Sequence, residues 1–361
     1  MDCHCEYLES SFWHADEHVV MCNTSSASEA DSLKQWLTKS NKLRGHVFFQ
    51  TSGSTGAAKW VALSKKALLA SAKTVNQHLS VKIGAKWGLA LPIHHVGGFG
   101  ILVRAFLSGG ECQIYHQPWD PIAFSRFVYT EKCEHISLVP TQVVDLVRAR
   151  CVAHHSVKSV VVGGGALSDE LVGQAKGLGW PVHRSFGMTE SASQIATGDS
   201  GDGWMDILGN REVRLNADGL LEWRGEAGLT CYVAKTDAGF ERVEALADGW
   251  FTTQDRVELQ GRKIRVLGRS DTLVKILGEL VDVNVIEQRL RIQIGCDCVI
   301  LTQPDERRGV KLIPVIESTK EITPLGFSGL ESLDSAISLE KFPRSALGKV
   351  KRGELKESLG L

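Results

Sequence analysis

Hydroxyl groups and glycines are concentrated in one short segment that follows the apolar run His46-Val47-Phe48-Phe49. The segment consists of Thr51, Ser52, Gly53, Ser54, Thr55 and Gly56, with Lys59 shortly after it. The glycines allow a sharp turn close to an anion, and the hydroxyl and main-chain N–H groups can donate hydrogen bonds to it. The spacing is not that of a Walker A loop, and a surface turn is a commoner use of such residues. The position after a buried strand favours a phosphate-binding loop.

Four further residues have the chemistry to bind a nucleotide. Thr189 and Glu190 offer a pair of oxygens, and Mg²⁺ that bridges phosphates takes one or two carboxylates together with substrate oxygens. The carboxylate of Asp255 is able to accept hydrogen bonds from both hydroxyls of a ribose. Arg269 is a delocalised cation that can contact ribose or phosphate oxygens. Alone, Glu190 would be interpreted as a solvated acid and Arg269 as an ordinary surface arginine.

The composition restricts the class of protein. The 361 residues are 43% hydrophobic and 23% charged, which is typical of a folded chain with more than one core. The 41 Lys and Arg nearly balance the 42 Asp and Glu, so we expect no binding to nucleic acid or to an anionic membrane. We find neither a membrane-spanning run nor a signal-peptide pattern, and we expect a cytoplasmic protein without membrane insertion. The nine cysteines lack a disulfide or zinc spacing, which favours reduced thiols.

Apolar periodicity predicts alternating strands and helices in the first part of the chain. We expect helices at residues 27–39, 64–79, 121–131 and 142–150, and strands at 46–49, 87–91, 113–115, 135–139 and 157–162. Ser64 is the expected N-cap of the second helix. Strands that alternate with helices indicate βαβ crossovers and a largely parallel sheet.

The pattern changes at about Ile207 to short segments broken by Gly and Asp, which predicts a β-rich subdomain with strands at 212–215, 220–223 and 256–259. The residues beyond Ser270 have their own helix, at 283–290, and strands at 298–301 and 312–317. The expected fold class is α/β. A large N-terminal domain, residues 1–270, combines mixed, mostly parallel sheets with helices and the β-rich subdomain. A small α+β C-terminal domain, residues 271–361, follows it.

Six segments resemble, in this order, the core motifs of the adenylate-forming acyl-CoA synthetase superfamily. They read TSGSTGAAK, LPIHHVGG, SFGMTESAS, DGWFTTQD, GRSDTLVKILGELV and FPRSALGKVKR. Together they extend from about Phe48 to Arg352, and six ordered motifs are far more specific than any one of them. The resemblance implies an ATP-dependent acid:CoA ligase that works through an acyl-adenylate.

The resemblance also implies where ATP binds. The implied contacts are Thr51, Ser52, Gly53, Ser54, Thr55, Gly56, Lys59, Gly163, Gly164, Gly165, Phe186, Gly187, Thr189, Asp255 and Arg269. The adenine would lie between the glycine triplet and the ring of Phe186. The family usually has Tyr at this position, so a contact through its hydroxyl is absent here.

The same motifs imply catalytic residues, which are Lys349, His95, Glu190 and Arg269. Glu190 would bind Mg²⁺, and Lys349 would act in adenylation. The small domain is expected to be mobile and to turn about a hinge at Asp271. That rotation would withdraw Lys349 and present the face formed by Lys275, Gly278 and Glu279 for the attack by coenzyme A.

The acid is suggested by residues 187–195 and 208–213, which are most similar to the o-succinylbenzoate-CoA ligase family of menaquinone biosynthesis. Such an acid needs a slot for its aryl ring and donors for a second carboxylate. The candidate contacts are His95, Ser191, Ser193 and Gly164. Arg104 interrupts an apolar helix pattern, where an unpaired cation is costly. An internal salt bridge is the ordinary alternative for Arg104.

One departure from the superfamily concerns the start of the chain. The phosphate loop begins at Thr51, whereas the superfamily carries on the order of a hundred residues before it. We therefore expect an N-terminally shortened large domain, with an acid pocket that is either minimal or completed in a homodimer. The expected partners are a small carboxylic acid, ATP and CoA. Two alternatives stay open, a CoA ligase for another aromatic or fatty acid and a catalytically silent nucleotide-binding homologue.

Overall fold

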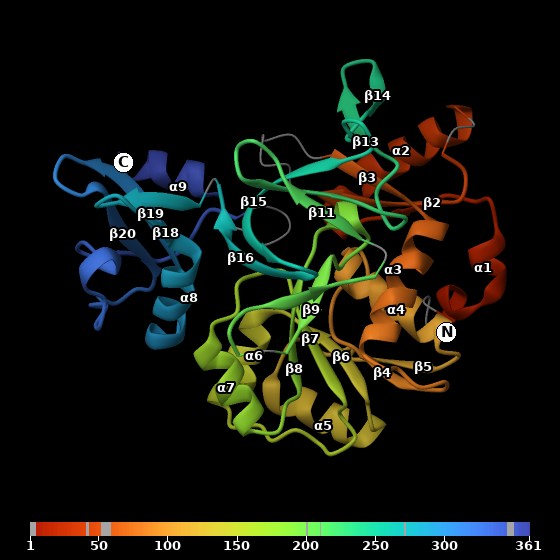
Figure 1. The fold of residues 1–361 in the computed structure, drawn as a ribbon, viewed down its shortest axis with the longest axis horizontal. Helices are drawn as coiled ribbons and strands as arrows, with labels where there is room; N and C mark the ends of the chain where they lie inside the picture. Colours follow the sequence, from red (N-terminus) through yellow and green to blue (C-terminus); the bar gives the residue numbers. More distant parts are fainter. Residues whose placement is uncertain are drawn as a thin grey trace. The chain divides into compact units, whose positions relative to one another are not determined.

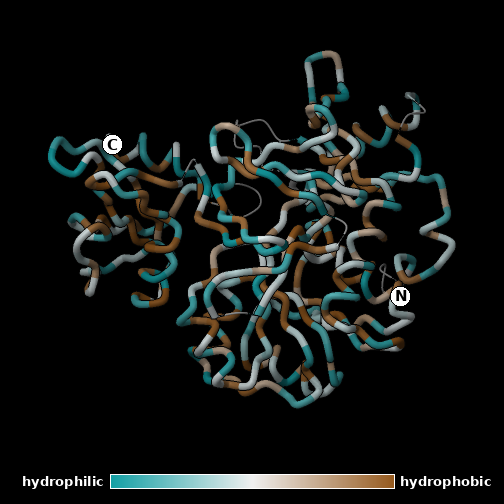
Figure 2. The backbone as a smooth tube through the Cα atoms, in the orientation of Figure 1, coloured by the Kyte–Doolittle hydropathy of each residue, from teal (hydrophilic) through white to brown (hydrophobic). Residues whose placement is uncertain are grey.

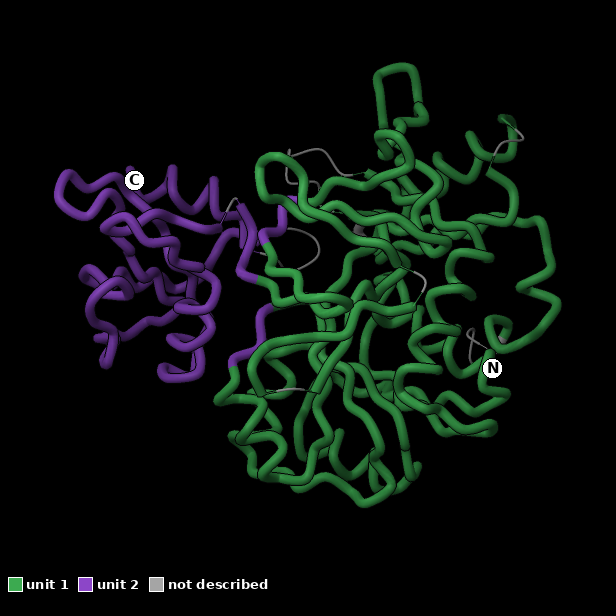
Figure 3. Tube along the Cα trace, in the orientation of Figure 1, with its two compact units in different colours: residues 1–165, 169–253, 257–266 green, residues 166–168, 254–256, 267–361 purple. Residues whose placement is uncertain are grey.

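The computed structural model describes residues 5–40, 43–51, 59–199, 201–209, 211–270, 272–344 and 350–361. The chain divides into two compact units, which Figure 3 shows in different colours. Unit 1 comprises residues 1–165, 169–253 and 257–266, and unit 2 comprises residues 166–168, 254–256 and 267–361. No helix among the described residues is long and apolar enough to cross a membrane.

The largest sheet has eleven strands in the order β11-β12-β15-β16-β10-β9-β8-β7-β6-β4-β5 (Figure 1). Its parallel half consists of β5 (Glu111–Ile114), β4 (Lys86–Leu89), β6 (His135–Leu138), β7 (Ser159–Val162) and β8 (Val182–Phe186). β6 and β7 are buried along their whole length, as is usual for parallel strands covered on both faces. Hydrophobic segments occur in both units, interspersed with hydrophilic ones (Figure 2). The predicted parallel pairing is confirmed for these five strands, whereas β8 and β9 pair antiparallel and begin the other half of the sheet.

Four helices accompany the parallel strands. They are α4 (Val96–Leu107), α5 (Pro121–Glu131), α6 (Pro140–Arg148) and α7 (Asp169–Gly177). α4 packs on β4, β5 and β6, while α6 lies between α5 and α7. The predicted bounds of α5 are correct, because Asp120 caps it and Pro121 fits its first turn. α6 begins two residues before the predicted start, at Pro140.

The other half of the large sheet is antiparallel. It consists of β9 (Ala196–Gly198), β10 (Met205–Ile207), β16 (Lys263–Arg269), β15 (Phe251–Gln260), β12 (Leu220–Arg224) and β11 (Glu212–Leu215). The β-rich region predicted from Ile207 is therefore present. However, the strands of this region belong to two sheets, because β13 and β14 are part of the second sheet, next to β3.

The second sheet has the order β1-β2-β3-β13-β14. Its strands are β1 (Val19–Met21), β2 (His46–Thr51), β3 (Lys59–Ser64), β13 (Cys231–Thr236) and β14 (Gly239–Val243), and α2 (Ala27–Ser40) and α3 (Lys65–His78) accompany them. Ser64 caps α3 as predicted, since its hydroxyl accepts the N–H of Ala67 at 3.0 Å. The sequence prediction missed β3. Thr51 and Lys59 are register partners, so residues 52–58 connect two adjacent antiparallel strands.

Short N-terminal elements complete unit 1, namely η1 (Cys5–Leu8), α1 (Ser10–His14) and η2 (Thr24–Ser26), with η3 (Thr189–Ser191) further along the chain. Aromatic rings hold η1 and α1 to α4, because Tyr7 and Trp13 both lie beside Phe99. The buried ammonium of Lys65 donates to the carbonyls of Phe12 and Ala15 at 2.6 and 2.9 Å. The N-terminal segment is thus part of the core of unit 1.

Unit 2 is a small α+β assembly. Its elements are β17 (Leu273–Ile276), β18 (Glu279–Asp282), α8 (Val283–Ile294), β19 (Cys298–Asp305), β20 (Gly309–Glu317), η4 (Gly329–Glu331), β21 (Ile337–Leu339) and α9 (Arg352–Ser358). β17 and β18 form a hairpin, and β19, β20 and β21 form a separate sheet. The predicted helix and both predicted strands are present here, each longer than predicted.

Candidate functional site

The predicted nucleotide residues of unit 1 follow the carboxyl ends of neighbouring strands. β6, β7 and β8 are adjacent and parallel, so their carboxyl ends meet at one edge of the sheet. The glycine triplet Gly163-Gly164-Gly165 follows β7, Phe186 ends β8, and η3 comes directly after Phe186. Ligands of open α/β sheets bind at such an edge. The structure thus brings both predicted adenine contacts to the same edge, with the Phe186 ring half-buried against the core.

The backbone after β8 is folded tightly around Gly187. A Cβ atom at Gly187 would lie 1.7 Å from the carbonyl oxygen of Ser193, so the close approach of these two segments requires glycine. Ala192 and Ser193 have positive φ angles of 50° and 104°, which carry the chain from η3 back towards β9. This turn fixes where Thr189 and Glu190 are presented.

The buried side chain of Arg211 stabilises the same turn. Its Nη2 donates to the carbonyls of Ser191 at 2.6 Å and Gln194 at 3.1 Å, and its guanidinium lies 5.5 Å from the ring of Trp223. Burial lowers the pKa of Arg211 to about 10. Arg211 was not predicted as a site residue, although the motif segment 208–213 contains it.

The carboxylate of Glu190 is bonded to a residue that the sequence analysis missed. The hydroxyl of Tyr232 donates to Oε1 of Glu190 at 2.8 Å. Burial, then the neighbouring Glu190, raises the pKa of Tyr232, so the phenol keeps its proton. The ammonium of Lys59 lies 5.5 Å from the centre of the same ring. Tyr232 therefore connects the predicted metal ligand with the lysine at the end of the predicted phosphate loop.

Backbone pairing fixes this arrangement. β13, which carries Tyr232, pairs antiparallel with β3, which begins at Lys59. Just before β13, the N–H of Leu229 donates to the main-chain carbonyl of Glu190 at 2.8 Å. The segment from Leu229 to Tyr232 thus contacts both the main chain and the side chain of Glu190.

The donors at Glu190 fit magnesium in number and kind. Mg²⁺ keeps several waters and takes one or two carboxylates together with phosphate oxygens, rather than a cage of protein ligands. The described residues contain no group of three or more His, Cys, Asp or Glu able to hold a metal ion. Glu190 is half-buried, with the Thr189 hydroxyl group next to it in η3. One carboxylate of this kind suits a cation that arrives with ATP.

Arg104 is a buried cation on α4 with hydroxyl partners. It is 2% exposed, and its Nη1 and Nη2 donate to the hydroxyls of Ser137 and Ser193, each at 3.2 Å. Its Nε has no partner among the described residues, and no described Asp or Glu forms an ion pair with it. Burial lowers the pKa of Arg104 to about 10. The internal salt bridge considered for Arg104 is therefore not found in the described part of the chain.

The two serines proposed to contact the acid lie in different environments. Ser191 is 0% exposed, and its hydroxyl donates to the carbonyl of Met188 at 3.0 Å while accepting the N–H of Met188 at 3.1 Å. A contact between Ser191 and a substrate would have to replace one of these bonds. The half-buried hydroxyl of Ser193 instead meets Arg104.

His95 precedes α4, and its ring lies 4.5 Å from the ring of His94. Burial lowers the pKa of His94. A pocket of ≈ 340 Å³ at the carboxyl ends of β4 and β5 includes His94 in its wall, together with Leu91, Pro92 and Tyr115. His95 is not among the residues that line it.

The remaining predicted residues belong to unit 2 or lie outside the described residues. Asp255 on β15 is 6% exposed, and Arg269 ends β16. Both are assigned to unit 2. The predicted residues outside the described part of the chain are Ser52, Gly53, Ser54, Thr55, Gly56, Asp271 and Lys349.

A family model described as AMP-binding enzyme matches residues 22–213, which is more than half of the chain. The chain belongs to this family of AMP-binding enzymes.

Two relatives of this AMP-binding enzyme carry the same name. The 2-succinylbenzoate–CoA ligase of Listeria monocytogenes is 28% identical over 350 residues, covering 91% of this chain and 72% of the relative. The Escherichia coli ligase of the same name is 32% identical over 76% of this chain, and the match spans 59% of that relative. A solved structure of an E. coli MenE variant with bound OSB-AMS has a TM-score of 0.69 at 26% identity, covering 87% of this chain and 68% of that chain. The resemblance to o-succinylbenzoate-CoA ligases is confirmed.

The site of this AMP-binding enzyme contains residues that no sequence motif marks. Tyr232 lies on a strand without a recognisable chemical pattern, and its contact with Glu190 joins residues 42 positions apart. Arg104 was noticed as a charge in an apolar helix, but its serine partners come from β6 and from the turn after η3. The sequence marks Arg104 as a charge within an apolar helix pattern, whereas Tyr232 is recognised only from the pairing of β3 with β13.

Proposed function

We propose that the protein is an ATP-dependent acid:CoA ligase that converts o-succinylbenzoate, ATP and CoA into o-succinylbenzoyl-CoA, AMP and diphosphate. Membership of the AMP-binding enzyme family supports the adenylate chemistry. Relatives named for this ligation support the choice of acid. The structural observation that carries this choice is the buried guanidinium of Arg104.

Arg104 supports an acid with a second carboxylate. A buried cation without an acidic partner is costly, because hydroxyl groups do not neutralise its charge. A carboxylate that enters with the substrate would remove this cost and would be held by a charge-assisted hydrogen bond. Ser193, which contacts Arg104, is three residues from Glu190 in sequence. A dicarboxylic acid held there would therefore lie near the residues proposed to bind the nucleotide.

The proposed reaction has two steps. In the first, an oxygen of the acid carboxylate attacks the α-phosphorus of ATP, and the bond to the diphosphate breaks. Lys59 and the loop of Thr51 neutralise negative charge on the phosphates, and Lys349 acts on the oxygens that gain charge. Magnesium at Glu190, when bound, shields the charge of the phosphates. In the second step, the CoA sulfur attacks the acyl carbon, and AMP leaves with the electron pair of the acyl–oxygen bond.

The test is acid-dependent exchange of labelled diphosphate into ATP. We expect exchange with o-succinylbenzoate and a rate lower by at least about 10² with 4-oxo-4-phenylbutanoate, which lacks the ring carboxylate, because a site that pairs a polar group rejects analogues without it. In Arg104→Met the rate with o-succinylbenzoate should fall towards that of the analogue. Arg126→Met, at an exposed position on α5, is the matched control and should behave as the wild type.

Two outcomes would contradict parts of this proposal. Equal rates with the two acids would remove o-succinylbenzoate as the substrate and would favour a ligase for another aromatic or fatty acid. Absence of exchange with every carboxylic acid, in a folded protein that binds ATP, would favour a catalytically silent homologue.

A further inference from the structure

The phenol of Tyr232 occupies one side of the Glu190 carboxylate. Its hydroxyl donates to Oε1 at 2.8 Å, and no other described side chain donates to this carboxylate. Oε2 is therefore the oxygen left for a cation. We propose that Tyr232 is a positioning residue that fixes the orientation of Glu190 towards the magnesium ion of MgATP. This inference rests on the proposed function, since it takes Glu190 as the metal ligand.

A main-chain hydrogen bond also fixes the position of Glu190. Leu229, three residues before Tyr232, donates its N–H to the carbonyl of Glu190 at 2.8 Å. The next residue, Thr230, donates its N–H to the carbonyl of Ala62 on β3 at 2.8 Å. The segment that ends in Tyr232 is thus bonded to η3 on one side and to β3 on the other. Glu190 is held at two points, its carbonyl and its carboxylate, by residues of one rigid segment.

The aromatic ring of Tyr232 makes a second interaction, with Lys59. The ammonium of Lys59 lies 5.5 Å from the ring centre, within the range of a cation–π interaction. Lys59 is the first residue after the proposed phosphate loop, and Glu190 is the proposed metal ligand. Tyr232 therefore lies between the two charged groups that would meet the phosphates of MgATP. Groups that orient a metal ligand in this way commonly change metal affinity by 10- to 100-fold when they are removed.

The proposal predicts a specific defect for Tyr232→Phe, which removes the hydroxyl and keeps the ring beside Lys59. ATP binding is measured at equilibrium by titration calorimetry, once with Mg²⁺ and once with EDTA, so that the readout does not depend on turnover. We expect ATP affinity with Mg²⁺ to fall by about 10- to 100-fold, and the affinity in EDTA to stay unchanged. Tyr129→Phe, at an exposed position on α5, is the matched control.

A double-mutant cycle with Glu190→Gln decides whether Tyr232 acts through Glu190. If it does, Tyr232→Phe adds little to the defect of Glu190→Gln. Full additivity, an equal loss in EDTA, or normal affinity with Mg²⁺ would each overturn the proposal. A normal Tyr232→Phe beside a defective Glu190→Gln overturns this inference alone. If Glu190→Gln itself binds MgATP normally, the assignment of Glu190 in the proposed function falls as well. Thermal melting of each variant shows that the fold is retained.

Discussion

Two arginines with similar burial have different hydrogen-bond partners in this molecule. Arg211 donates to two carbonyl oxygens of one turn, so its charge is used to hold the backbone between η3 and β9. The hydrogen-bond acceptors of the Arg104 guanidinium among the described residues are hydroxyl groups, and it also lies 6.0 Å from the ring centre of Trp87. Hydroxyls can turn to accept from a guanidinium or to donate to an incoming carboxylate. Burial alone would therefore not distinguish a structural arginine from one available to a substrate.

Gly187 gives a prediction at the same scale. A Cβ at this position would lie 1.7 Å from the carbonyl oxygen of Ser193, so Gly187→Ala must displace backbone. We expect the free energy of unfolding to fall by at least about 3 kcal/mol. Gly173→Ala is the matched control, because a Cβ in that turn of α7 meets nothing within 4 Å. It should be neutral or stabilise the protein by about 0.5 to 1 kcal/mol.

Urea denaturation measures both changes. A Gly187→Ala variant as stable as the wild type would show that the turn can open without cost, and the account of how Glu190 is presented would then be wrong.

A sequence motif can mark a single residue as a candidate for the site. A residue that belongs to the site only through a contact in the folded chain cannot be predicted in this way. Glu190 was predicted as a metal ligand from the chemistry of its neighbours and from the resemblance, and this role stays a prediction. Tyr232 could not be predicted, because its function depends on the register of β13 against β3. The hydroxyl of Ser191, proposed for the substrate, is used within its own turn. A serine after an acidic residue looks the same in sequence whether its hydroxyl faces a ligand or a carbonyl.

Helices and strands were predicted best where the apolar periodicity of the sequence agrees with the residues that are buried in the structure. α5 matches its predicted bounds because a proline and a capping aspartate mark its start. β3 was missed because its apolar run lies between the hydroxyl-rich segment and a strong helix signal at Ser64, and we assigned no strand there. The miss matters, since β3 makes the phosphate segment a connection between two hydrogen-bonded strands. The division of the β-rich region between two sheets depends on long-range pairing, which a local pattern does not contain.

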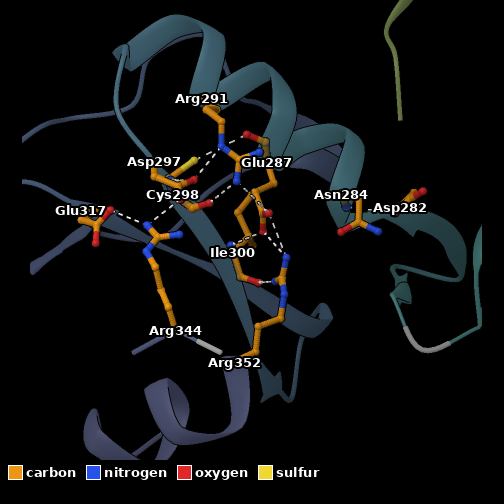
Figure 4. A network of polar contacts seen from close by, with 10 residues as sticks. All are labelled: Asp282, Asn284, Glu287, Arg291, Asp297, Cys298, Ile300, Glu317, Arg344 and Arg352. Carbon is orange, nitrogen blue, oxygen red and sulfur yellow. Dashed lines mark hydrogen bonds and ion pairs between the residues drawn. The ribbon is translucent and has the colours of Figure 1, made fainter. Parts of the chain in front are cut away.

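In unit 2, partly exposed ion pairs join the elements, and among their side chains that of Glu287 is buried. Arg352, at the start of α9, donates to both carboxylate oxygens of Glu287 on α8, at 2.9 and 2.7 Å (Figure 4). Arg344 donates to Asp297 at 2.8 Å and to Glu317 at 2.5 Å. The side chain of Glu287 is 8% exposed, and its Oε2 also accepts the N–H of Ile300 at 2.8 Å. The chain on both sides of residues 345–349 is thus anchored to the body of unit 2.

This network predicts that two neighbouring ion pairs, Arg352–Glu287 and Lys351–Glu354, contribute unequally to stability. Arg352→Met would leave the Glu287 carboxylate buried without its strongest partner, and we expect unit 2 to lose about 2 to 3 kcal/mol. The neighbouring Lys351→Met removes an exposed pair with Glu354 and should cost less than about 1 kcal/mol. Differential scanning calorimetry on the full chain measures both. Equal melting temperatures of the two variants would mean that another group compensates the charge of Glu287.

On the scale of the whole molecule, the predicted site residues are assigned to two units. Gly163, Glu190, Tyr232 and Arg104 belong to unit 1, whereas the segments 254–256 and 267–361 belong to unit 2. Unit 2 is assembled from three stretches of chain, and the domain boundary between Ser270 and Asp271 stays a prediction. The hinge at Asp271, which lies outside the described residues, stays our proposal. The family and its α/β fold were predictable because six motifs occur in a fixed order, whereas the assembly of units depends on contacts between distant segments.

If unit 2 serves the two half-reactions with different faces, single substitutions in it should separate these half-reactions. Lys349→Ala should slow adenylation by about 10² to 10³, the scale of losing one oriented electrostatic contact in a water-poor site. Conversion of supplied acyl-adenylate and CoA should continue at nearly the normal rate. Lys275→Glu, at an exposed position on β17, should do the reverse, because the new negative charge repels the phosphates of CoA. We expect a loss of about tenfold in thioester formation with normal diphosphate exchange.

Single-turnover kinetics of each half-reaction on the two variants distinguish separate faces from one shared site. Opposite defects would require that Lys349 and Lys275 act at different times. If both half-reactions slowed together in Lys349→Ala while the protein remained folded, the lysine would act in both steps, and a rotation about Asp271 would no longer be needed to explain catalysis. A defect of Lys275→Glu that vanishes at high ionic strength would confirm its electrostatic origin, since screening weakens interactions between exposed charges.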